Sequence, residues 1–219
     1  MNNYQIEEIH DVGDMGFAAY LLADQHASQH IEFKGIDKSN VEKIRYLFKF
    51  KNVDDCYFLG GEYEMEQLEI DATSFFNAIN FLKNICDISP DYKSKGNSIL
   101  NPVSHSKEVE NYSFVQTSNQ NIFKTDDPVF AAALISNNFQ FIGIDKVSDE
   151  KVFYSFYHEP YYIRPDIYYT AKGIYENYKT RGFKVAPNRF FYTIKALEEN
   201  DYEDLICNLE EEEINKKAC

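Results

Sequence analysis

The sequence predicts an α+β protein made of two repeated units, each a small antiparallel sheet with helices packed on one face, joined by a polar linker. Three sequence blocks recur in the same order in both halves of the 219-residue chain, which is the signature of an internal repeat. Each half alternates helix-type blocks with aromatic and β-branched runs typical of strands. A Ser-, Asn- and Lys-rich segment without periodicity separates the halves. The predicted boundaries are repeat 1 at 1–86, a linker at 87–121, repeat 2 at 122–200 and an acidic extension at 201–219.

The first block reads DMGFAAYLL at 14–22 and DPVFAAALI at 127–135. Both copies predict a helix, because Asp14 and Asp127 stand where a side chain would accept the unpaired N–H groups of a first turn. Pro128 suits the first helical position, where no donor is needed.

The second block, FKGIDK at 33–38 and FIGIDK at 141–146, predicts a strand that runs into a polar turn. The aromatic and β-branched runs at 46–50 and 152–156 follow it. Each run is expected to pair with the strand before it as a hairpin.

The third block, at 70–79 and 185–194, predicts a closing helix in each repeat. Its start is marked by Asp71 and Thr73 in one copy and by Pro187 and Asn188 in the other. A core-facing stripe is predicted at Phe75, Ile79 and Leu82. Before this helix, repeat 2 inserts residues 161–183 where repeat 1 has only the acidic stretch 54–69, for which no helix is expected.

Charge is unevenly divided along the chain, whose formal net charge is −14. Residues 1–86 carry −8 and residues 198–219 carry −7, whereas residues 122–197 carry +2. No apolar run approaches the roughly 20 residues that span a bilayer, and the start lacks the order of a signal peptide. The four cysteines form no CxxC pair and read as reduced thiols. These features predict a cytoplasmic protein without a membrane partner, in the host cytoplasm if a phage encodes it.

Motifs for catalysis or cofactor binding are missing from the sequence. It contains no GxxxxGK[ST] phosphate loop and no GxSxG nucleophile elbow. Pro165-Asp166 is followed by Glu176 to Lys179, which is one residue out of register for a nuclease motif. We therefore expect a protein that is not an enzyme and that has no cofactor and no metal site.

A tyrosine and lysine stripe in the repeat 2 insertion is the first candidate binding site. If the insertion is a helix from about Pro165, one face carries aromatic and ammonium groups in alternation, and further cations lie at its ends. Such a face suits a nucleotide or single-stranded nucleic acid, because bases stack on aromatic rings and lysine neutralises phosphate. Packing of the tyrosines at the core edge is the alternative. The candidate residues are Arg164, Tyr168, Lys172, Tyr175, Lys179, Arg181 and Lys184.

Two acidic groups form the second candidate site, for binding a protein. Nine of the sixteen residues from 198 to 213 are acidic. Three interpretations are open for such a segment. It is solvated, or it covers the tyrosine and lysine stripe of the same chain, or it mimics a phosphate backbone for a basic partner. The candidate residues are Asp54, Asp55, Glu62, Glu64 and Glu66 in repeat 1 and Glu210, Glu211, Glu212 and Glu213 in the extension.

Three stretches of repeat 2 carry a family resemblance: FKTDDPVFAAALISNNFQFIGID, VFYSF and VAPNRFFYTIKALEEN, within residues 123–200. They resemble a small domain of unknown function found in phage and integrative-element genomes, and residues 12–84 resemble it more weakly. Repeat 1 departs from the pattern with Gly16 for Val129 and Asp71 for Ala186. The resemblance implies the fold and a phage-type origin, and it brings no catalytic residues.

Three functions follow from these features. The first is a non-enzymatic, phage-type acidic protein that binds and blocks a host protein, for counter-defence or host takeover, with mimicry of nucleic acid as one route. The alternative is a binder or sponge of a nucleotide or single-stranded nucleic acid through the tyrosine and lysine stripe. A structural subunit of a virion or replication complex is a less specific third. The sequence leaves the oligomeric state open.

Overall fold

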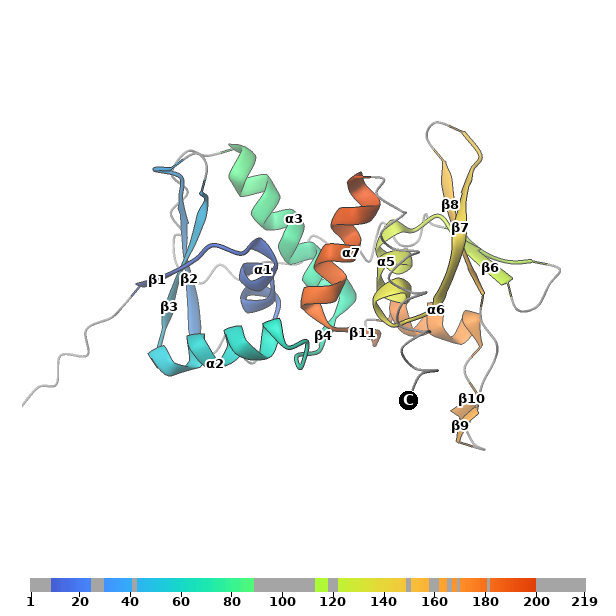
Figure 1. Ribbon diagram of the computed structural model, residues 1–219, viewed down its shortest axis with the longest axis horizontal. Helices are drawn as coiled ribbons and strands as arrows, with labels where there is room; N and C mark the ends of the chain where they lie inside the picture. Colours follow the sequence, from blue (N-terminus) through green and yellow to red (C-terminus); the bar gives the residue numbers. More distant parts are fainter. Residues whose placement is uncertain are drawn as a thin grey trace, which may run out of the picture. The chain divides into compact units, whose positions relative to one another are not determined.

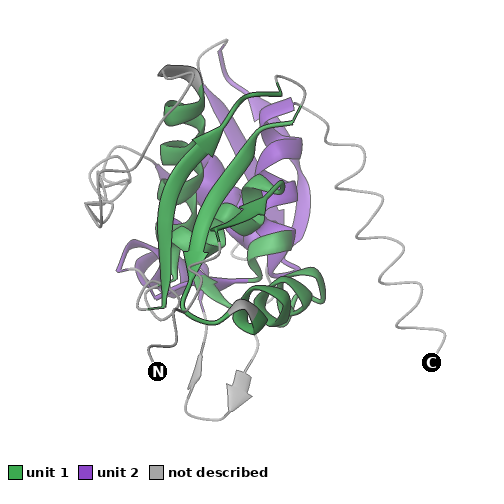
Figure 2. Ribbon diagram, turned by 90° about the vertical axis from the view of Figure 1, so that its left-hand side faces the viewer, with its two compact units in different colours: residues 1–70, 74–104, 186–188 green, residues 71–73, 105–185, 189–219 purple. Residues whose placement is uncertain are grey.

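The computed structural model has a mixed α+β fold with small antiparallel sheets (Figure 1). The chain divides into two compact units (Figure 2). Unit 1 comprises residues 1–70, 74–104 and 186–188, and unit 2 comprises residues 71–73, 105–185 and 189–219. The residues that the structure describes are 9–24, 30–40, 43–88, 113–117, 122–148, 151–157, 162–164, 167–168, 170–180 and 182–199.

Unit 1 is built on a three-stranded sheet in the order β1-β3-β2. Helices α1 and α3 lie on one side of this sheet (Figure 1). The elements up to Ile88 are β1 (Ile9–Val12), α1 (Met15–Ala23), β2 (Ile31–Asp37), β3 (Arg45–Phe50), α2 (Val53–Glu64), β4 (Ile70–Asp71) and α3 (Ala72–Ile88).

Unit 2 is built on a four-stranded sheet in the order β5-β6-β8-β7, and β9 and β10 form a separate antiparallel pair. Helices α5 and α6 lie on one side of the larger sheet (Figure 1). The elements are β5 (Phe114–Gln116), β6 (Ile122–Thr125), α5 (Pro128–Ser136), β7 (Gln140–Lys146), β8 (Val152–Tyr157), β9 (Tyr162–Arg164), β10 (Ile167–Tyr168), α6 (Ala171–Lys179), β11 (Lys184–Val185) and α7 (Pro187–Glu199).

Both predicted hairpins are confirmed, and each contains a glycine bulge. β2 pairs with β3 and β7 pairs with β8, in each case with a register shift that ends at the glycine. Gly35 has a φ of 137° and Gly143 a φ of 152°, in the region that only glycine adopts without strain. The shared glycine of the GID motif thus fixes the same irregularity in both hairpins.

The predicted helix starts are confirmed by their capping hydrogen bonds. The Phe17 N–H donates to Asp14 at 2.6 Å. Asp127, which is fully buried, accepts from the N–H groups of Val129 and Phe130 at 2.9 and 3.1 Å. Pro128 occupies the first turn of α5, as expected. Each carboxylate satisfies donors that the helix itself leaves unpaired.

Aromatic side chains between sheet and helices form much of each core. The predicted stripe of α3 is confirmed, because Phe75, Ile79 and Leu82 are each 0% exposed. Phe33 of β2 contacts Phe81 of α3 with ring centroids 6.2 Å apart. In unit 2 the corresponding cluster includes Phe123, Phe130, Phe141, Phe156, Tyr175 and Tyr178.

The helix expected from about Pro165 begins later, so that prediction is wrong in its first part. Residues 162–164 and 167–168 form β9 and β10, and α6 starts at Ala171. The Thr170 hydroxyl accepts the N–H of Gly173 at 3.0 Å and so caps the helix. Tyrosine and isoleucine before this cap favour strands.

The acidic stretch 54–69, for which no helix was expected, contains the twelve-residue helix α2. The Asn52 side chain accepts the Asp54 N–H at 3.3 Å, and Asp54 and Asp55 lie in the first turn. Carboxylates at this end are favoured by the helix dipole. Both units therefore have a helix between the hairpin and the closing helix.

β5 lies inside the segment predicted as a linker. It pairs with β6 in antiparallel register, with Phe114 opposite Thr125. Phe114 also stacks on Tyr175 at a centroid distance of 5.0 Å. Three residues in a polar context are too short for a periodic signal, which explains why the pattern did not predict a strand. Residues 87–88 of the predicted linker are the last residues of α3, and residues 89–112 and 118–121 lie outside the described residues.

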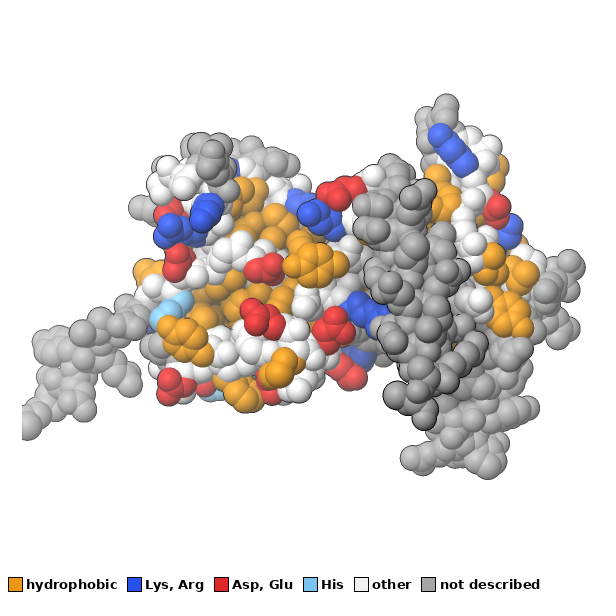
Figure 3. All heavy atoms as spheres, in the orientation of Figure 1, with side chains coloured by type: hydrophobic (Ala, Val, Ile, Leu, Met, Phe, Trp, Pro, Cys, Tyr) orange, Lys and Arg blue, Asp and Glu red, His pale blue; other side chains and the backbone are white. Residues whose placement is uncertain are grey.

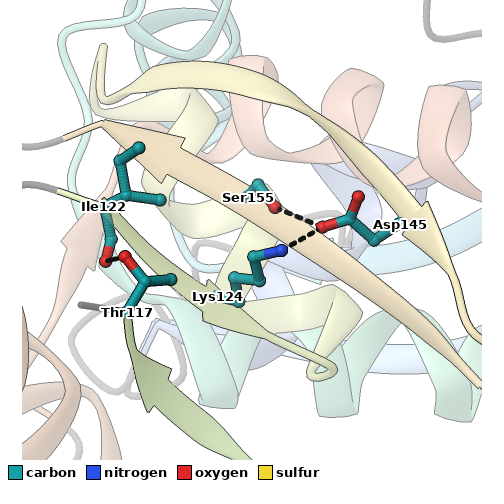
Figure 4. A network of polar contacts seen from close by, with 5 residues as sticks. All are labelled: Thr117, Ile122, Lys124, Asp145 and Ser155. Atoms are coloured by element: carbon teal, nitrogen blue, oxygen red, sulfur yellow. Dashed lines mark hydrogen bonds and ion pairs between the residues drawn. The ribbon is translucent and has the colours of Figure 1, made fainter. Parts of the chain in front are cut away.

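The outer face of the unit 2 sheet carries a polar network (Figure 4). Lys124 donates to Asp145, and the Ser155 hydroxyl donates to the same carboxylate oxygen at 3.1 Å. These two hydrogen bonds, the one from Lys124 first, hold the pKa of Asp145 below its ordinary value. A depressed carboxylate pKa stabilises the fold above pH ~4, and this contribution is lost as the pH falls through the folded-state pKa.

We expect Lys124→Met to raise the pKa of Asp145, because the larger of the two interactions that lower it disappears. NMR titration of the side-chain carboxyl resonance measures this. Asp37 is the matched control, since its pKa is lowered by hydrogen bonds from Ser39 in the other unit and should not move. An unchanged pKa at Asp145 would contradict the network.

Candidate functional site

Helix α2 places the predicted repeat 1 acids on one surface of unit 1. Asp54 and Glu64 are exposed, whereas Asp55 and Glu62 are half-buried at its flanks. Glu66 follows the helix with a positive φ of 55° and is exposed. The structure therefore places four of the five acids on one helix and the fifth two residues after its end.

Three large hydrophobic side chains of the same surface are exposed. Tyr57 is 73% exposed, Phe58 is 63% exposed and Met65, directly after α2, is 62% exposed. At 3.6 residues per turn, positions 57, 58, 61 and 65 share one face of a helix. Sequence reasoning missed this hydrophobic face, because the spacing has meaning only if residues 53–64 are helical.

The opposite face of α2 packs into the unit. Tyr63 is 5% exposed and lies 5.3 Å from Phe17 and 6.4 Å from Tyr20, measured between ring centroids. Burial raises the pKa of the Cys56 thiol, which disfavours the thiolate that a nucleophile needs. The helix is thus anchored on one side and presents its aromatic side to solvent. We call residues Asp54, Asp55, Tyr57, Phe58, Glu62, Glu64, Met65 and Glu66 the α2 surface.

The electrostatics of the α2 surface are strongly one-sided. Between Asn52 and Leu82 the chain has seven acidic residues and no lysine or arginine. Figure 3 shows hydrophobic side chains bordered by acidic ones over the unit that carries α2. Exposed aromatic side chains with a charged rim are typical of a protein-binding surface. The acidic rim favours a basic partner.

The tyrosine and lysine stripe is divided between three elements. Arg164 lies on β9, Tyr168 lies on β10, and Lys172, Tyr175 and Lys179 lie on α6. The side chains of Arg164 and Tyr168 and the whole of Arg181 fall outside the described residues. The stripe is therefore not a single helical face, because α6 begins only at Ala171.

Tyr175 occupies a packing position within unit 2. It is 6% exposed, and it contacts Phe114 at 5.0 Å and Phe130 at 5.2 Å between centroids. Burial, with a smaller effect of the nearby Asp127, raises its pKa to about 12. Lys172 and Lys179 are exposed, and the Lys179 Nζ lies 5.5 Å from the centroid of the Tyr175 ring. Lys184 is exposed on β11.

Several predicted features have no described geometry. Glu210, Glu211, Glu212 and Glu213 lie outside the described residues, with the rest of the acidic extension. Among the residues that are described, no three His, Cys, Asp or Glu side chains gather as a metal ion would need. Also within those ranges, no helix combines the length and hydropathy needed to cross a bilayer.

Comparisons of this chain with protein families, with curated proteins and with solved structures find no match. The resemblance to a phage-type domain, carried by residues 123–200, stays a prediction.

Proposed function

We propose that this protein is a non-enzymatic binding protein that uses the α2 surface to occupy a basic surface of another protein and block it. The observation that carries the proposal is the exposure of Tyr57, Phe58 and Met65 within a segment that has no lysine or arginine. A host protein is the partner that the predicted phage-type resemblance suggests. Proteins that bind nucleic acid have basic surfaces of the required kind.

The two parts of the α2 surface have different physical roles. Tyr57 and Phe58 supply rigid apolar area, and burying such area stabilises a complex by about 25 cal/mol per Å² before the costs of association. The surrounding carboxylates increase the rate of encounter with a basic partner and exclude acidic ones. Binding should therefore weaken with salt, because exposed charges are screened beyond about 8 Å at physiological ionic strength.

We also propose that the two units are copies of one ancestral element. Support comes from their matching order of strand, helix, hairpin, helix, short strand and closing helix. The sheet orders β1-β3-β2 and β6-β8-β7 agree, and both hairpins have their register shift at the GID glycine. Exposed aromatic residues then distinguish α2 from α6, whose tyrosines at 175 and 178 are buried.

The double variant Tyr57→Ser/Phe58→Ser tests the proposal by affinity capture from host lysate. We expect the captured partner to be lost, because truncating an interface anchor costs about 2 kcal/mol or more, roughly 30-fold in affinity. Both side chains are more than 60% exposed, so the fold should be retained, and a thermal melt checks this.

Tyr192→Ser is the matched control for this capture, because Tyr192 is 56% exposed on α7 of the other unit. It should capture the same partner as the wild type, and higher salt should weaken both. Identical captured proteins for the wild type and the Tyr57/Phe58 variant would overturn the proposal.

A further inference from the structure

In unit 2 the strand β5 covers the outer edge of β6. The Asp126 N–H donates to the Ser113 carbonyl at 3.3 Å, and the Thr117 N–H donates to the Ile122 carbonyl at 3.0 Å. Phe114 of this strand stacks on Tyr175 and lies 5.5 Å from Phe123 between centroids. β5 thus contributes both backbone hydrogen bonds and an aromatic side chain.

In unit 1 the strand β1 takes the place of β6. In β1, His10 lies opposite Phe48 of β3. In β6, Phe123 lies opposite Phe156 of β8, so β1 and β6 pair with the central strand of their sheet in the same register. Within the residues that the structure describes, no strand pairs with the other edge of β1. The position that β5 fills in unit 2 therefore has no described counterpart in unit 1.

The free edge of β1 presents backbone groups at known positions. Antiparallel hydrogen bonds alternate along a strand, so β6 bonds β5 through residues 122, 124 and 126. The same register assigns Ile9, Asp11 and Gly13 to the free edge of β1. A groove of about 680 Å³ lies at the Gly13 end of β1, and its lining residues are Asp11, Gly13, Met15, Lys43, Ile44, Arg45 and Tyr46.

Helix α2 has a glycine at the position that corresponds to the ring of Tyr175 on α6. Tyr63 lies against Phe17 as Tyr178 lies against Phe130, with centroids 5.3 and 4.8 Å apart. Three residues before each tyrosine, α2 has Gly60 where α6 has Tyr175. A Cβ at Gly60 would meet the Phe17 ring at 3.8 Å, an ordinary contact, so the glycine is not forced by crowding.

We infer that the free edge of β1 binds an extended segment of the partner protein as an added strand. This rests on the proposed function and names the chemistry of the partner. The residue opposite Val12 is aromatic, because it takes the place of Phe114 opposite Thr125. The flanks of the segment are basic, because α2 carries Glu62 and Glu64 where α6 carries Asn177 and Lys179.

The probe is a capped peptide with the β5 sequence YSFVQTS, residues 112–118, with two lysines added at each end. It is titrated into the isotope-labelled full chain, and amide hydrogen exchange is followed by NMR. We expect slower exchange at Asp11 and Gly13, with little change at His10 and Val12, whose N–H groups face β3. A peptide with serine in place of its phenylalanine should bind at least about tenfold more weakly.

Asp11→Pro removes one N–H from the free edge, and proline is tolerated on an edge strand. It should weaken peptide binding at least about tenfold. Asp11→Ala is the matched control, because it also loses the 2.9 Å ion pair with Arg45 but keeps the N–H, and it should bind the peptide normally.

Equal peptide binding by Asp11→Pro and Asp11→Ala, protection at other residues, or no binding would overturn the inference. A dimer that Asp11→Pro converts to a monomer would assign the edge to a second copy of the chain and would also overturn it. The proposed function fails separately, if capture from lysate does not depend on Tyr57 and Phe58.

Discussion

Phe130→Ala is expected to lower the free energy of unfolding of unit 2 by about 3–5 kcal/mol, the usual cost of removing a buried aromatic ring. Phe130 is 0% exposed on α5. Its ring lies 4.8 Å from Tyr178, 5.2 Å from Tyr175 and 6.3 Å from Phe183, measured between centroids. The substitution leaves a cavity at the point where α5 and α6 meet.

Native-state hydrogen exchange measures this loss of stability for unit 2 alone. A single unfolding transition of the whole two-unit chain would not separate the two units. The free energy of opening obtained from the protected amides of α5 should fall by the full loss of about 3–5 kcal/mol. Tyr192→Ala is the control, since an exposed substitution stays within about 0.5 kcal/mol. A loss below about 1 kcal/mol for Phe130→Ala would contradict the packing described for unit 2.

Tyr175→Ala is expected to destabilise unit 2 by about 3 kcal/mol, because its ring is buried between Phe114 and Phe130. Lys172→Ala/Lys179→Ala is the matched control on the same helix. Both lysines are exposed, so this variant should unfold like the wild type. Thermal and denaturant unfolding of the two variants measure the difference.

The same variants separate packing from ligand binding. A titration of mononucleotides and short oligonucleotides should give the same result for the wild type and for the lysine variant. If the lysine variant loses binding that the wild type has, and Tyr175→Ala leaves stability unchanged, the tyrosine and lysine stripe is a ligand site. The packing account of α6 would then be wrong.

Local signals in the sequence predicted much of the fold. The helix caps at Asp14 and Asp127 were predictable because each side chain accepts an N–H only three residues further along the chain. Such a hydrogen bond depends on local backbone geometry alone. Phe75, Ile79 and Leu82 form a buried stripe because helical spacing alone brings them together. The GID motif predicted the hairpins because a strand, a polar turn and a second strand follow one another directly in the sequence. The bulge at its glycine was not predicted.

The candidate site was only partly predictable. The acids of the α2 surface were visible as charge, but Tyr57 and Phe58 align with Met65 only once the segment is helical. Gly60 and Gly61 disfavour a helix by about 1 kcal/mol each, and tertiary packing of Tyr63 on Phe17 overrides this. The partnership of β5 with β6 depends on long-range pairing, which no local pattern encodes.

A hydrogen exchange footprint of the full chain, alone and bound to its captured partner, tests the central claim most directly. The α2 surface as the binding site predicts slower exchange in residues 53–66, and a reduced effect in high salt. Protection confined to residues 171–179, with 53–66 unchanged, would contradict it and move the binding surface to α6.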